Sequence, residues 1–107
     1  MTTPANRPPL RIQILNVIGD FKKINELILE DFKKNKFLIN RFIKDVEMCL
    51  DQLEKESDSK TVLTTLKWIN KELQAFKELP LNTQTKLIWA EKALTWANIL
   101  QHRAKLA

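Results

Sequence analysis

The chain has few of the residues that make turns. It contains one glycine and four prolines among 107 residues, and it has no tyrosine. Three of the four prolines fall within the first nine residues. Strand-rich folds need more turn residues than this, whereas a chain rich in Leu, Ile, Lys and Glu favours helices. We therefore predict an all-α protein, with a flexible proline-containing tail over residues 1–9 and a single domain over residues 10–107.

Cysteine and histidine are equally scarce, with one of each, Cys49 and His102. These two residues fall on different predicted helices, so they form neither a zinc-binding cluster nor a catalytic Cys–His pair. The sequence also has no glycine-rich loop of the kind that cradles a phosphate. We therefore expect a protein that is not an enzyme, with no catalytic residue, no metal site and no cofactor.

Long apolar runs are missing as well. No run approaches the roughly 20 residues that a membrane-spanning helix requires, and the opening MTTPANRPPL lacks the layout of a secretory signal. Cys49 has no partner for an intramolecular disulfide, which favours a reducing compartment. We expect a cytoplasmic protein without a membrane span.

Apolar residues recur at helical spacing along three segments. They are Ile14, Val17, Phe21, Ile24, Ile28 and Phe32 in the first, Ile39, Phe42, Val46, Cys49, Leu50 and Leu53 in the second, and Val62, Leu66, Ile69, Leu73 and Phe76 in the third. Ser57, Asp58 and Ser59 are good caps for the start of the third segment. The apolar residues of each segment should form the side of one helix that faces the core.

A fourth segment follows Pro80, with Asn82 or Thr83 as its cap. It carries the alanine row Ala90, Ala93, Ala97 and Ala104, with Trp89 and Trp96 on one side and Leu87 and Leu94 on the other. Small residues let a neighbouring helix come close, so the others should pack on this helix. Because short loops join antiparallel neighbours, we predict an antiparallel four-helix bundle over residues 10–34, 36–56, 59–79 and 83–104.

The first predicted helix has two alternatives. Gly19 either weakens it or separates a short segment, residues 10–18, from a helix that Asp20 caps. The apolar alternation over residues 10–14 also permits a strand.

The boundary between the first two predicted helices is also open. Asn35 is the only plausible helix-ending residue there, and we predict a turn at this position. Without a turn there, one helix would run from about residue 20 to residue 56. Such a long helix would oligomerise to cover its exposed apolar seam.

The net charge of +5 lies wholly in residues 59–107, which hold eight Lys or Arg and three acids. A basic excess predicts an anionic partner such as nucleic acid, an acidic protein or a membrane surface, or else serves only solubility. As contacts to a nucleic-acid backbone, without sequence specificity, we predict Lys60, Lys67, Lys71, Lys92 and Arg103, together with Lys33, Lys34, Lys36, Arg41 and Lys44.

Some large apolar side chains miss the core line of their own helix. Trp68 is the clearest, roughly 120° from that line and beside the lysines of its helix. Such residues either cover bundle edges under lysine stems or anchor a protein partner. As partner-binding residues we predict Trp68, Phe37, Met48, Ile12 and Leu15; Leu27 also lies off its line.

Together these features predict a non-catalytic helical subunit of a larger complex, with basic faces toward nucleic acid and apolar patches toward neighbouring proteins. In size, charge and expected helix count the chain resembles the small helical subunits of CRISPR effector complexes, which contact nucleic acid. One alternative is a stand-alone protein binder such as an inhibitor, an immunity protein or an adaptor. Another is a homodimeric scaffold built on the long-helix variant.

Overall fold

A computed structural model describes residues 9–105 of the chain. It contains three α-helices, α1 (Leu10–Glu56), α2 (Lys60–Phe76) and α3 (Lys86–Arg103), and no strand within the described range. The all-α prediction is confirmed, but the predicted count of four helices is not matched. Apart from Pro9, which precedes α1 as its N-cap, the predicted tail lies outside the described residues.

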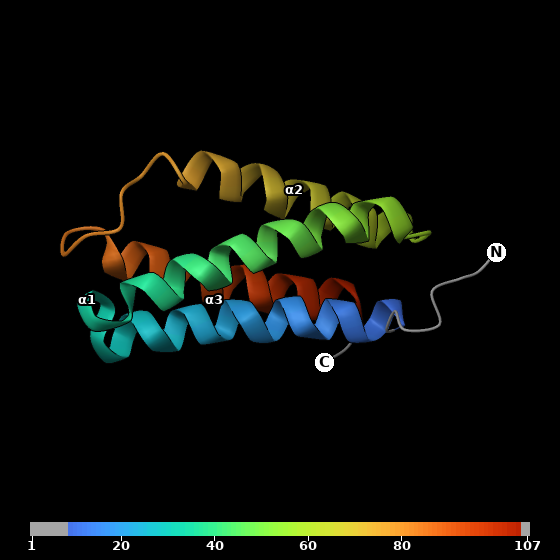
Figure 1. Cartoon of the computed structure of the whole chain (residues 1–107). Coiled ribbons are helices and arrows are strands. Elements are labelled where there is room, and N and C mark those ends of the chain that lie inside the picture. Colours follow the sequence, from blue (N-terminus) through green and yellow to red (C-terminus); the bar gives the residue numbers. More distant parts are fainter. Residues whose placement is uncertain (1–8, 106–107) are drawn as a thin grey trace.

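Helix α1 replaces two predicted helices because it folds back on itself. A straight helix of 47 residues would measure about 70 Å, yet the longest dimension of the molecule is 47 Å. The backbone leaves helical conformation at Asp31, with φ −167° and ψ 89°, and the two halves of α1 run antiparallel from there (Figure 1). We call residues 10–30 the first arm and residues 32–56 the second arm. Gln13 near one end of α1 hydrogen-bonds Glu56 at the other.

Two polar side chains stabilise the reversal. Asp31 Oδ1 accepts a hydrogen bond from the backbone N–H of Lys34 at 3.1 Å, as an N-cap does at a helix start. Asn35 Nδ2 donates to the carbonyl of Leu27 at 3.1 Å, one of the carbonyls that the end of the first arm leaves without a helical partner. The chain therefore reverses one helical turn before the predicted position, because Asp31 breaks the helix while Asn35 stays helical. A continuous helix over residues 20–56 is wrong.

The other boundaries differ from the prediction by a few residues. Gly19 lies inside α1, so the break there is absent, and the strand over residues 10–14 is wrong because Leu10 already begins the helix. Ser59 Oγ caps α2 by accepting from the N–H of Val62. Helix α3 begins later than predicted because Asn82 Oδ1 accepts from the N–H groups of Gln84 and Thr85 and forms a turn ahead of the helix.

The core combines the inner faces of all three helices. Trp96 on α3 is its largest fully buried side chain and contacts Phe21 of the first arm and Phe76 at the end of α2, with ring centroids 5.4 and 5.7 Å apart. The predicted core stripes are buried, except that Phe42, Cys49 and Phe76 are half-buried.

Three predictions about the core are corrected. Leu87 and Leu94, which were expected to flank the alanine row inside the bundle, are exposed because they lie on the outer side of α3. Leu27 is buried although it misses the core line of its helix. It lies four residues before Asp31, where the chain reverses.

None of the three helices in this part of the chain is both long enough and apolar enough to cross a lipid bilayer.

Candidate functional site

A groove of about 780 Å³ lies between the first turns of α2 and the last turns of α3. Its α2 wall consists of Lys60, Thr61, Thr64, Thr65 and Trp68, and its α3 wall of Asn98, Ile99, His102 and Arg103. We call it the Trp68 groove. Its volume lies within the range of sites that hold small molecules or single nucleotides.

Trp68 lines the groove because of its position on α2. The core line of this helix, through Leu66 and Ile69, is fully buried, and Trp68 points away from that line and is 41% exposed. The floor of the groove is sealed by Thr65, which is buried and whose hydroxyl donates to the carbonyl of Thr61 at 2.9 Å. The groove therefore presents an accessible aromatic face over a floor whose polar group is satisfied.

The charge of the groove is positive and uncompensated. Lys60 and Arg103 line it, and none of the lining residues is an acid. The ion pairs among residues 9–105 are Lys23–Glu26, Lys77–Glu47 and Lys92–Glu72, and none of them involves Lys60 or Arg103. An anion in the groove would thus meet cations that no carboxylate neutralises.

A row of lysines borders this groove on α2. Lys60, Lys67 and Lys71 fall within one narrow sector of the helix at 100° per residue, and all three are exposed. None of the three has an ion-pair partner in the described range. We call these residues the lysine row; it extends the positive charge of the groove along the outer ridge of α2.

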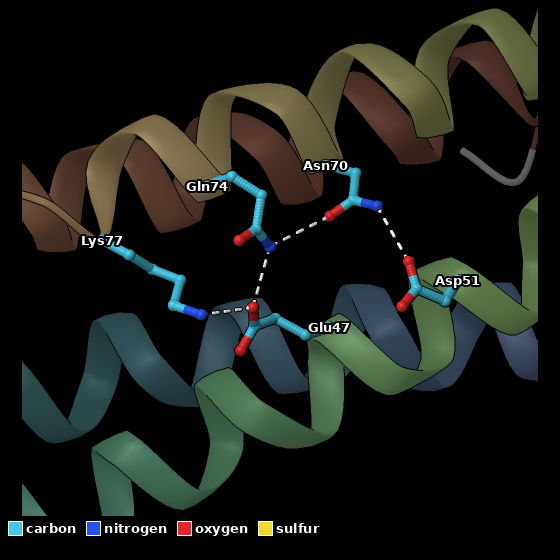
Figure 2. A network of polar contacts seen from close by, with 5 residues as sticks. All are labelled: Glu47, Asp51, Asn70, Gln74 and Lys77. Carbon is cyan, nitrogen blue, oxygen red and sulfur yellow. Dashed lines mark hydrogen bonds and ion pairs between the residues drawn. The ribbon is translucent and has the colours of Figure 1, made fainter.

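A hydrogen-bond network on the flank of α2 next to the lysine row joins this helix to the second arm. There the carboxylates of the second arm are taken up by amides and one lysine: Glu47 accepts from Gln74 at 2.8 Å and from Lys77 at 2.7 Å, and Asp51 accepts from Asn70 at 3.0 Å (Figure 2). Burial raises the pKa of Glu47, but the hydrogen bonds from Lys77 and Gln74 outweigh it and hold the pKa below its ordinary value. This network fixes the rotation of α2 about its own axis.

Lys92 has a different environment from the other predicted cations. Its ammonium group lies 3.1 Å from Glu72 Oε1, which also accepts a hydrogen bond from the indole N–H of Trp96 at 3.1 Å. The hydrogen bond from Trp96 lowers the pKa of Glu72, burial opposes this, and Lys92 lowers the pKa further. Lys92 is therefore neutralised at the α2–α3 contact.

The remaining predicted residues lie away from the groove. Lys33, Lys34 and Lys36 are exposed at the reversal of α1, at the opposite end of the molecule (Figure 1). Phe37, Arg41, Lys44 and Met48 are exposed on the outer face of the second arm, with Phe37 81% and Met48 66% accessible. Ile12 and Leu15 are exposed on the first arm. Of the predicted residues, only Lys60, Trp68 and Arg103 meet in one groove.

Sequence reasoning missed the polar lining of the groove and several exposed apolar side chains. Thr61, Thr64 and Asn98 line the groove; Thr61 and Thr64 lie seven and four residues before Trp68, on the same side of the helix, and this spacing was a signal for these two. The exposed Leu29, Leu87, Ile88 and Leu94 were also missed.

Cys49 is the single cysteine of the chain and is half-buried. Burial raises the pKa of the Cys49 thiol, and the carboxylates of Asp20 and Asp45 raise it further, so the group stays protonated and weakly nucleophilic at neutral pH. Between residues 9 and 105 no three His, Cys, Asp or Glu side chains gather where they could hold a metal ion. Comparisons with protein-family models, with curated proteins and with solved structures find no match to this chain.

Proposed function

We propose that this chain is a non-catalytic subunit of a larger complex that binds nucleic acid through the Trp68 groove and the lysine row. The observation that carries the proposal is the convergence of uncompensated cations beside an accessible indole. Lys60 and Arg103 come from different helices and lie in one groove without a carboxylate in its lining.

The shape of the basic surface favours a polyanion over a single small anion. The lysine row runs from Lys60 to Lys71, and the eleven steps between them measure about 16 Å at 1.5 Å per residue; Lys60 continues the row into the groove. A nucleic-acid strand presents phosphates at regular intervals over such a length, and each Lys or Arg that neutralises one releases counterions. Contacts of this kind are made to the backbone and do not distinguish one base sequence from another.

Contacts to neighbouring proteins belong, in this proposal, to the exposed apolar residues outside the groove. Phe37 and Met48 stand on the outer face of the second arm among Arg41 and Lys44. Phenylalanine, methionine and arginine are enriched at protein interfaces, whereas a folded chain gains nothing from exposing phenylalanine or methionine to water. This face lies on α1, away from the groove, so both contacts can exist together.

The test is the salt dependence of nucleic-acid binding, measured by fluorescence anisotropy of a labelled oligonucleotide. Neutralisation of about three or four phosphates predicts that Kd rises roughly 10- to 50-fold between 50 and 200 mM salt. No binding by the wild-type protein at 50 mM salt would contradict the proposal.

Two triple variants with the same net charge test the location. Lys60→Glu/Lys67→Glu/Lys71→Glu and Lys33→Glu/Lys34→Glu/Lys36→Glu each change the net charge from +5 to −1, because three cations become three anions. We expect the first triple variant to lose at least tenfold more affinity than the second. Equal losses would show that net charge alone, and not this surface, governs binding; the helical circular-dichroism signal checks that both variants fold.

A further inference from the structure

We infer that the Trp68 groove seats one unpaired base of a single-stranded nucleic acid against the indole of Trp68, with the flanking phosphates on Lys60 and Arg103. The inference rests on the proposed function and goes beyond it. It specifies a single-stranded ligand and gives the groove a contact with a base, which binding to the backbone alone does not require.

Trp68 differs from the other two tryptophans in a way that fits stacking. Trp89 and Trp96 are 4% and 1% exposed, and their indole N–H groups donate to the carbonyl of Leu79 and to Glu72. Trp68 is 41% exposed, and its indole N–H has no acceptor among residues 9–105. Part of its ring is therefore accessible to a ligand, and a base stacked on such a ring contributes substantially to affinity.

The polar groups around the ring are also unused. Thr64 on α2 and Asn98 on α3 both line the groove and make no hydrogen bond within the described part of the chain. A hydroxyl and an amide provide both donors and acceptors, as the edge of a base requires. Neither group is specific for one base, so the groove should accept several.

The position of the ring selects an unpaired base. Trp68 lies in a groove between two helices and not on a projecting edge. A base in a duplex is covered on both faces by its neighbours and exposes only its edges, so it cannot present a face to this ring. A single strand turns its bases outward and stacks them on aromatic side chains while cations follow the backbone.

Intrinsic tryptophan fluorescence tests the inference with wild-type protein. A short oligothymidylate should quench the emission of Trp68 by stacking a base on its ring. The buried Trp89 and Trp96 are shielded from the ligand, so their emission should not change. An abasic strand of equal length carries the same phosphates and should bind without quenching, with a Kd roughly 5- to 150-fold higher. A duplex of the same length should likewise leave the emission unchanged.

Variants assign the signal to the ring. Trp68→Leu should remove both the quenching and the preference for oligothymidylate over the abasic strand, while Trp68→Phe should keep part of that preference. Phe37→Leu, which changes an exposed aromatic residue outside the groove, should keep the quenching and the strand preference of wild type. Salt-dependent binding should persist in Trp68→Leu, since it depends on the cations.

The outcomes separate this inference from the proposed function. Equal affinity for the two strands, or a preference that survives in Trp68→Leu, would overturn base stacking while leaving backbone binding intact. Binding of neither strand at 50 mM salt would overturn both. Quenching by polyglutamate as strong as that by oligothymidylate would overturn the inference in favour of an acidic protein segment.

Discussion

Glu72 connects α2 to α3 through two hydrogen bonds at one carboxylate oxygen. Trp96 and Lys92 both donate to its Oε1 at 3.1 Å. The acceptor thus satisfies the indole N–H of the most buried tryptophan and neutralises a lysine at the same time. Removal of the charge should weaken both bonds together, since bonds to an ionised acceptor are about twice as strong as neutral ones.

We predict that Glu72→Gln lowers the free energy of unfolding by about 1 kcal/mol at pH 7. The amide keeps an oxygen that can accept from Trp96 but loses the charge that attracts Lys92. Urea denaturation followed by circular dichroism measures the difference.

The difference in stability between wild type and Glu72→Gln should depend on pH. The pKa of Glu72 in the folded protein lies below its ordinary value of 4.5, so its contribution to stability is fully present above that value and is lost as the pH falls through the folded pKa. The stability difference between wild type and Glu72→Gln should therefore shrink from pH 7 toward about pH 3. A difference that stays constant over this range would show that the charge has no part in the effect.

Gly19 and Asp31 illustrate how an individual helix is interrupted or kept intact. Gly19 permits a break, yet its backbone stays helical and a Cβ added there would meet no atom within 4 Å. Asp31 permits helix, yet it takes an extended conformation because its carboxylate caps the second arm. The reversal of α1 thus depends on side-chain capping and not on the residue with the most flexible backbone.

We predict that Gly19→Ala raises the free energy of unfolding by about 0.5–1 kcal/mol, because alanine loses less backbone entropy in a helix and nothing obstructs its methyl group. The melting temperature should rise by several degrees. Gly19→Ser should give a smaller gain, in the order of helix propensity. A loss of stability in Gly19→Ala would mean that this position does not stay helical in solution.

The core could be predicted from apolar periodicity, because each stripe depends on residues close together in the chain. Val17, Val46 and Leu66 were placed correctly and are fully buried. The reversal was predicted at Asn35 but lies at Asp31. Both residues are capable caps, and only the packing of the two arms decides which of them breaks the helix. Leu27 was misplaced because the periodicity of its own helix does not show which further side of that helix is covered in the folded molecule.

The candidate site could be predicted only in part. The exposure of Trp68 follows from its angle on α2, which the sequence contains. The groove could not be predicted from the sequence, because Lys60 and Arg103 lie on different helices. Whether they come together depends on how α2 and α3 are rotated against each other. That rotation is set by contacts such as Gln74 with Glu47, between residues far apart in the chain.

The arrangement of the entire protein follows from the reversal of α1. The first arm packs along α3, as the hydrogen bond from Asn25 to the carbonyl of Ala90 shows, while the second arm packs along α2 through Glu47 and Asp51. One helix therefore supplies both sides of the bundle opposite α2 and α3 (Figure 1).

We predict that spin labels at Arg11 and Lys55, both exposed, lie closer together than labels at Arg11 and Lys34. In the folded-back α1 the first pair occupies one end of the molecule and the second pair spans its length. In a continuous helix the order reverses, with separations of about 66 and 35 Å at 1.5 Å per residue. Pulsed electron–electron double resonance on the two double-labelled proteins distinguishes these arrangements by the order of the distances alone.

The placement of the Trp68 groove has a practical consequence for handling the protein. α1 begins and α3 ends at the same end of the molecule as the groove, whereas residues 77–85, which connect α2 to α3, lie at the other end (Figure 1). An affinity tag or fluorophore attached near residue 103 would lie beside the groove and hinder the access of a ligand, and one attached near residue 10 would lie at the same end of the molecule. A reporter inserted into the exposed connection at residues 83–84 would stay clear of it.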